Sequence, residues 1–364
     1  MLKVKFFIPL LFVVGCALAG VTGTIRAQTK KFEGRIGRSR FEMTLRREAG
    51  RLDGSYFYTR IGGANSLSLH GKIDADGKFV MQEFDASGTQ TGEFSGVWEE
   101  EADEPGATLE GEWEKTNAKE PQHFSASEQM IFFTGNWRIN TKELKESFKT
   151  KRLDITAEYP ELVGANGTSD AGFNQVVRAR VTQNIAHFKK EFFALPAEYL
   201  KRIPREETNY CDISYDIVYA DDDLISVNFA SDSYSGGAHP SHYFFTITYD
   251  LKQNRELKLA DLFKPGARYL ELISDYAIRD LQSRKVPGSD ENAGLAQDIF
   301  KDGALPKAEN YARWNITRKG LMFTFNEYQV GAYVFGPQTV IVPYAKLEEI
   351  ARPGGALVKT AVSE

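Results

Sequence analysis

Two histidines in a glycine-rich loop are the residues of this chain best suited to chemistry. The loop, residues 236–242, reads Gly236-Gly237-Ala238-His239-Pro240-Ser241-His242. Paired glycines allow positive φ or a close approach to a ligand. Metal binding would need both imidazoles to converge, but a spacing of three puts them on opposite sides of a strand, and Pro240 opposes a helix. The pattern therefore favours a structural turn in which His239 hydrogen-bonds the backbone, and it predicts no metal or cofactor.

A serine nucleophile could be proposed from Ser235 or Ser241 beside His239. The sequence has no Gly-x-Ser-x-Gly elbow, and a triad requires a geometry that spacing alone does not supply. We therefore predict no catalytic residue and keep an envelope hydrolase that uses the 236–242 loop as the alternative. Cys211 lies on the apolar face of a predicted strand, which indicates a buried, inert thiol.

A second candidate site is an aromatic segment, residues 325–336, that holds Tyr328 and Tyr333 in a long connection between predicted strands. Such a segment could form a platform for a peptide or a glycan. The simpler interpretation, which the sequence favours, is a loop whose tyrosines cover the sheet edge. The candidate ligand-binding residues are Tyr234, Gly236, Gly237, His239, His242, Tyr328 and Tyr333.

The N-terminal part of the chain predicts a small β-barrel. Alternation with period two is the signature of a strand, and residues 32–113 repeat the pattern apolar-x-Gly-x-apolar five times. Seven or eight short strands separated by turns indicate an antiparallel meander that curls into a barrel. Trp98 and Trp113 are expected to fill its core. The acidic run at residues 99–104 is expected to be a solvated hairpin tip.

The second part predicts an α+β domain with an antiparallel sheet and two main helices. Apolar residues recur at helical spacing between Phe173 and Phe192 and again at residues 269–283, and groups of alternating strands surround both helices. The change of pattern predicts domains at residues 28–125 and 126–364. The polar stretch at residues 115–122 is the expected linker.

Four segments of this second part resemble a known extracytoplasmic domain, shared by lysozyme-sensing anti-sigma factors and by the non-catalytic half of secreted peptidoglycan deacetylases. The likeness covers about residues 150–350 and excludes the N-terminal repeat. The resemblance implies an envelope location and a recognition role. It does not extend to the separate metal-dependent domain that carries the chemistry of the deacetylases. The four segments are residues 232–239, residues 257–263, residues 314–323, and residues 325–336 running into 340–344.

The N-terminus has the pattern of an export signal. Lys3 and Lys5 precede an uncharged apolar run, and residues 1–27 form the expected signal peptide. An alternative is lipidation of Cys16, because Val13-Val14-Gly15-Cys16 resembles a lipobox. Residues 1–27 hold three basic and no acidic residues, so their removal changes the net charge from −5 to −8. This charge disfavours nucleic acid as a partner, and we expect membrane association only through a lipid on Cys16.

The sequence as a whole predicts an exported cell-envelope protein that binds or senses a ligand without catalysis. The expected location is the periplasm or the extracellular space, with an outer-membrane lipoprotein as the alternative. The expected partner is a lysozyme-like protein or a peptidoglycan fragment.

Overall fold

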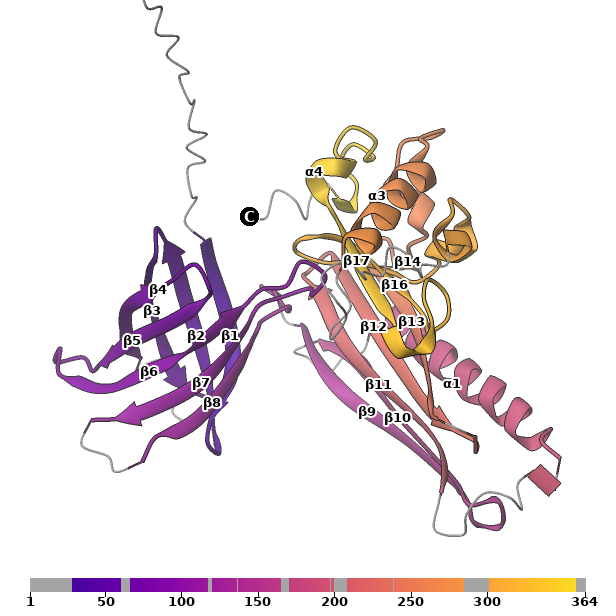
Figure 1. Cartoon of the computed structure of the whole chain (residues 1–364), viewed down its shortest axis with the longest axis horizontal. Coiled ribbons are helices and arrows are strands. Elements are labelled where there is room, and N and C mark those ends of the chain that lie inside the picture. The colour runs from indigo at the N-terminus through magenta and orange to yellow at the C-terminus, as the bar shows by residue number, and fades with distance from the viewer. Residues whose placement is uncertain are drawn as a thin grey trace, which may run out of the picture.

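A computed structural model describes residues 28–59, 66–116, 120–135, 137–164, 170–196, 198–199, 208–237, 239–284 and 301–357. The predicted signal peptide, with Cys16, lies outside these residues. The chain forms an N-terminal β-barrel and a second, α+β domain that lies beside it (Figure 1). This mixed architecture agrees with the fold class predicted from the sequence.

The barrel is closed by eight strands, each antiparallel to its neighbours, and β1 pairs with both β2 and β8. The repeated glycines lie where adjacent backbones come close together. A Cβ on Gly111, for example, would lie 2.1 Å from the carbonyl oxygen of Ser95. The strands are β1 (Gln28–Ile36), β2 (Ser39–Glu48), β3 (Arg51–Tyr58), β4 (Leu67–Ile73), β5 (Lys78–Phe84), β6 (Gln90–Glu99), β7 (Thr108–Lys115) and β8 (Gln122–Glu128).

Aromatic and aliphatic side chains fill the barrel interior. Trp98 packs edge-on against Phe32 with ring centroids 5.1 Å apart, and Trp113 is buried in the same cluster, as predicted. The interior also holds the carboxylate of Glu83. It accepts hydrogen bonds from the Tyr56 hydroxyl at 2.5 Å and the Trp113 indole at 2.8 Å, so its burial is compensated.

The structure corrects the predicted domain boundary. Strand β8 extends to Glu128, so a boundary at residue 125 falls inside the barrel, and residues 115–122 run from the end of β7 to the start of β8. The connection to the second domain follows Glu128. There, the amide of Phe132 donates to the carbonyl of Ala220 at 2.7 Å, and the amide of Ala220 donates to the carbonyl of Met130 at 2.8 Å.

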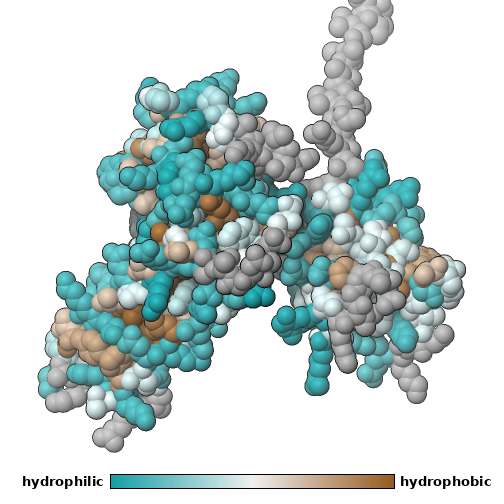
Figure 2. Space-filling model, turned by 180° about the vertical axis from the view of Figure 1, so that it is seen from behind, coloured by the Kyte–Doolittle hydropathy of each residue, from teal (hydrophilic) through white to brown (hydrophobic). Residues whose placement is uncertain are grey.

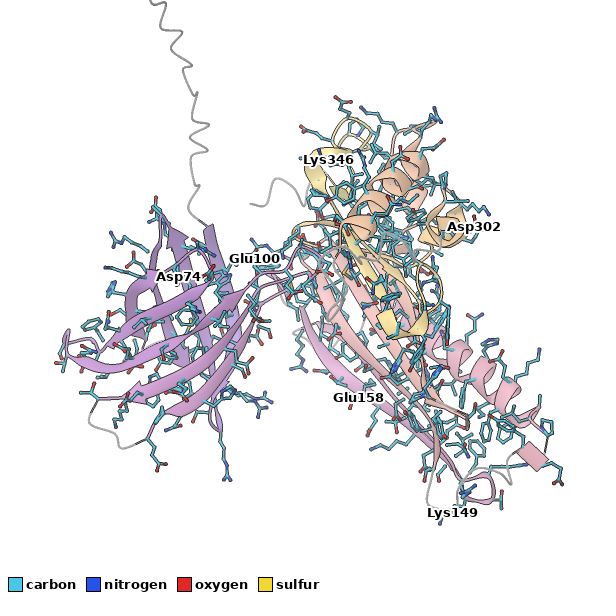
Figure 3. The ribbon with its side chains drawn as sticks, viewed as in Figure 1. Asp74, Glu100, Lys149, Glu158, Asp302 and Lys346 are labelled. Atoms are coloured by element: carbon cyan, nitrogen blue, oxygen red, sulfur yellow. The ribbon has the colours of Figure 1, made fainter. Side chains whose placement is uncertain are left out.

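The acidic run at residues 99–104 is largely exposed, as predicted, but it also contacts the second domain, which the sequence did not predict. Lys319 donates through Nζ to the carbonyls of Glu101 and Glu104 at 2.8 and 2.9 Å, and Arg284 lies 3.2 Å from Asp103. Glu100 lies at the junction of the two domains (Figure 3). The run therefore docks the barrel against the second domain.

The second domain is built on a six-stranded sheet with the order β14-β13-β12-β11-β10-β9. Its pairs are antiparallel except β10 and β11, which are parallel because the helix α1 forms the crossover between them. The strands are β9 (Trp137–Phe148), β10 (Leu153–Gly164), β11 (Asn209–Ala220), β12 (Leu224–Tyr234), β13 (Ser241–Asp250) and β14 (Arg255–Glu256).

Each face of this sheet packs against a different layer. Helix α1 (Ala171–Phe193) covers one face, and the side chain of Asp170 caps it by accepting from the amide of Phe173. Cys211 is buried on that face, and burial raises the pKa of its thiol to about 11, which agrees with the inert thiol predicted.

The opposite face carries a three-stranded sheet, β15 (Trp314–Ile316), β16 (Gly320–Phe325) and β17 (Gln338–Pro343), which packs with helix α3 (Tyr269–Ser283). Helices α1 and α3 are the two that the sequence predicted. The short helical elements are η2 (Lys149–Lys151), η3 (Leu259–Leu262), η4 (Lys301–Ala304), η5 (Ala308–Tyr311), η6 (Tyr333–Phe335) and α4 (Tyr344–Leu347).

The surface is largely hydrophilic. Seen from behind, brown hydrophobic area gathers over the lower end of the second domain (Figure 2). Within the described residues, no helix has the length and apolar character needed to cross a membrane.

Candidate ligand-binding surface

The predicted site lies at the tip of the hairpin formed by β12 and β13. The register pairs Asp232 with His242 and leaves the glycines to turn the chain. Gly236 and Gly237 have φ of 88° and 116°, a conformation that favours glycine. The hydroxyl of Tyr234 donates to the carbonyl of Gly237 at 3.3 Å, so the last residue of β12 braces the turn.

His239 makes the backbone hydrogen bond that the sequence predicted. Its Nδ1 lies 2.7 Å from the carbonyl oxygen of Pro240, which can only accept, so Nδ1 is the donor. The imidazole also stacks on Tyr333 with ring centroids 3.6 Å apart, and the Tyr333 hydroxyl donates to the carbonyl of Pro240 at 3.1 Å. The segment 325–336 therefore folds over the hairpin tip.

Tyr328 projects from this segment in an unusual conformation. Its φ is 62°, which is rare for a bulky side chain and costs on the order of 1 kcal/mol. Its side chain is 56% exposed, and its hydroxyl lies 3.5 Å from Nε2 of His239. Desolvation and the nearby carboxylate of Glu327 raise the pKa of Tyr333. The segment covers the edge of β13, because Glu327 and Asn326 accept hydrogen bonds from the amides of His242 and Phe244, and its two tyrosines also lie together as an aromatic surface.

His242 belongs to a row of polar side chains that crosses the sheet. Its Nδ1 bonds to a carboxylate oxygen of Asp232, and its Nε2 lies 3.9 Å from Glu327. Asp232 is paired in register with Asp212, and burial, with an added contribution from Asp232, raises the pKa of Asp212. Because both ring nitrogens of His242 face carboxylates, neither is directed at a nucleophile.

The seven candidate residues therefore come together, whereas the proposed serine and histidine pair does not. Ser235 and Ser241 line a groove beside α1, and within the described residues no hydrogen bond joins either serine to His239. The described residues also contain no group of three or more His, Cys, Asp or Glu side chains placed to hold a metal ion.

Sequence reasoning missed Asp232 and Glu327, which hold His242 in place. Asp232 precedes the paired glycines in the sequence by nearly the same number of residues as His242 follows them. Pairing the two strands of a hairpin about this turn would therefore have placed Asp232 opposite His242. No comparable local signal marks Glu327, which reaches the hairpin from a distant segment of the chain.

Comparison with known proteins matches two segments of the chain to family models. Residues 146–242 match the family model described as "Deacetylase PdaC", and residues 260–345 match "Protein of unknown function (DUF3298)". Both matches fall in the α+β domain, as the resemblance seen in the sequence implied. The chain is thus a DUF3298/PdaC-like domain protein.

A curated relative and two solved structures are similar to the chain. Peptidoglycan-N-acetylmuramic acid deacetylase PdaC of Bacillus subtilis is 28% identical over 202 residues, which span 56% of this chain and 40% of that protein. A DUF3298 family structure from Bacteroides fragilis is 19% identical with a TM-score of 0.45, covering 63% of this chain and 99% of its own. One from Pseudomonas aeruginosa is 14% identical with a TM-score of 0.39, covering 60% and 95%.

Proposed function

We propose that the protein is an exported cell-envelope binding or sensing protein without catalytic activity. Its recognition surface comprises the seven clustered residues, called here the hairpin–loop surface. The two family matches and the relative named for peptidoglycan support an envelope-associated protein. The observation that carries the proposal is the strained, exposed Tyr328 beside the stacked rings of His239 and Tyr333. The hairpin–loop surface consists of Tyr234, Gly236, Gly237, His239, His242, Tyr328 and Tyr333.

The chemistry of this surface suits an amphipathic ligand. Tyrosine presents a large apolar ring with a polar tip and loses little side-chain entropy on binding. Tyr328 and Tyr333 have ring centroids 5.8 Å apart, and the exposed Val334 extends the apolar area. Asp232 and His242 add polar groups next to the rings. A peptidoglycan fragment or a lysozyme-like protein offers both kinds of contact.

The test is calorimetric titration of the purified protein with soluble peptidoglycan fragments and, separately, with lysozyme. We expect one of them to bind, and Tyr328→Ala to weaken that binding at least tenfold, or about 1.4 kcal/mol, because a central aromatic contact is lost. Phe193→Ala removes another exposed aromatic side chain, at the end of α1, and should leave the affinity unchanged. Absence of binding to both ligands, or equal affinity of Tyr328→Ala and the wild type, would contradict the proposal.

The alternative is an envelope hydrolase that uses the 236–242 loop, and the bond between His242 and Asp232 is the observation in its favour. We rank it second because the loop serines face the groove beside α1. Incubation with purified peptidoglycan and analysis of the products would detect turnover. If the wild type turns over peptidoglycan and a folded His239→Ala variant does not, the protein is an enzyme and the binding proposal is wrong.

A further inference from the structure

A polar groove lies on the other side of the same hairpin, between α1 and strands β12 and β13. Its volume is about 620 Å³. Helical positions Gln183, Asn184 and His187 line one wall, since residues three and four apart share a face of a helix. Ser233 and Tyr243 line the opposite side from the sheet. The groove therefore has one amide-rich wall and one wall of hydroxyl and aromatic groups.

The serine hydroxyls of this groove are available to a ligand. Within the described residues, the side chains of Ser233, Ser235 and Ser241 make no hydrogen bond to another side chain or to the backbone, whereas Ser231 lies 3.8 Å from the buried thiol of Cys211. Alternate residues of a strand are about 6.8 Å apart and point to the same side. Each hydroxyl offers one donor and two acceptor sites. Ser233 and Ser241 are paired in register across β12 and β13, so both hydroxyls lie on the groove side of the sheet, and Ser235 follows β12 in the turn.

The charged side chains of the groove already have partners. The guanidinium of Arg180 makes two bonds to Glu256, at 3.0 and 3.1 Å, and His187 lies 3.3 Å from Glu191. The charge of Arg180 is therefore already neutralised and is not available to select an anionic ligand. Tyr243 is 46% exposed and offers its ring at the rim.

We propose that this groove binds a neutral oligosaccharide of pyranose sugars. Sugar hydroxyls would pair with the serines, with the amide of Gln183 and with the amide oxygen of Asn184, whose Nδ2 donates to the carbonyl of Arg180 at 2.9 Å. The apolar face of one ring would stack on Tyr243. The inference rests on the proposed function and deepens it by naming a ligand class and a second contact area. The two areas are contiguous, because Ser235 and Ser241 flank the glycine turn that carries the hairpin–loop surface.

The test uses a tetramer of N-acetylglucosamine as the probe, titrated into the full protein by calorimetry. We expect Ser233→Val and Tyr243→Ala each to weaken binding at least fivefold, the first by removing a hydroxyl that pairs with the sugar and the second by removing the stacking ring. Valine suits a strand, so Ser233→Val should fold. Ser214→Val is the matched control, because Ser214 lies on β11 and faces the opposite side of the sheet. Circular dichroism verifies the fold of each variant.

The two proposals give different results. If the tetramer does not bind, or if both groove variants bind it like the wild type, the groove inference is wrong. The proposed function survives that result if peptidoglycan fragments or lysozyme still bind in a Tyr328-dependent way. If neither the tetramer nor those ligands bind, both proposals are overturned.

Discussion

The contact between the two domains depends on a buried carboxylate whose charge can be removed with a single substitution. Glu128 is the last residue of β8, and its side chain is 2% exposed. It lies 2.6 Å from Nζ of the equally buried Lys30 and 2.8 Å from Arg318 of the second domain, and it accepts from the amide of Ala107 at 3.0 Å. One carboxylate therefore joins the first strand of the barrel, the last strand and the neighbouring domain.

Replacing Glu128 with Gln should be strongly destabilising. The amide has nearly the same shape but leaves the buried ammonium of Lys30 with Glu100 as its remaining acidic partner, at 2.8 Å. Breaking a buried ion pair typically costs about 3–5 kcal/mol, and the bond that Gln can still accept from Lys30 reduces this. We expect a loss of about 3 kcal/mol in the free energy of unfolding.

Denaturant unfolding monitored by tryptophan fluorescence would measure this loss, because Trp98 and Trp113 report on the barrel. Glu110→Gln is the matched control, since Glu110 is largely exposed on the adjacent strand β7 and should change the free energy by less than 0.5 kcal/mol. In the double variant with Lys30→Met, part of the loss should be recovered, because both charges are then absent. A loss below about 1 kcal/mol for Glu128→Gln would refute the reasoning.

Three further predictions concern the barrel, the domain junction and the N-terminus. Gly111→Val should destabilise the barrel by about 3 kcal/mol in the same assay, because its Cβ would clash with the backbone of Ser95; a neutral effect would mean that the strands are not so close. Burial of Glu100 opposes its ionisation, but Lys30 and Lys319 outweigh it and hold the pKa of Glu100 below its ordinary value. The contribution of ionised Glu100 to the free energy of unfolding should be complete above about pH 5 and lost as the pH falls through the lowered pKa. Glu100→Gln should therefore lower stability at pH 7 and change it little at pH 2.5. An equal loss of stability at both pH values would contradict this. Cys16→Ala should leave the protein soluble in the periplasmic fraction if residues 1–27 are an ordinary signal, and a shift from membrane to soluble fraction would establish lipidation.

Local patterns in the sequence were sufficient to predict the glycine-centred strands of the barrel and both long helices, but not the polar strands β8 and β9. The five glycine-centred repeats predict strands because alternation with period two depends only on neighbouring residues. The apolar spacing from Phe173 to Phe192 predicts α1 for the same reason. The residue types at the hairpin tip also indicated a site, since paired glycines allow the positive φ that this tight turn needs.

Contacts between distant residues decided the rest. The polar stretch that precedes residue 126 indicated a domain boundary, but β8 is a barrel strand because it pairs with both β1 and β7, and Glu128 at its end contacts Lys30 and Arg318, which lie far away in the sequence. The acidic run between β6 and β7 would be solvated by itself, and only the approach of Lys319 and Arg284 turns it into an interface. Burial of a charge is favourable only when a partner is already in place, and the sequence of one segment does not contain the position of that partner.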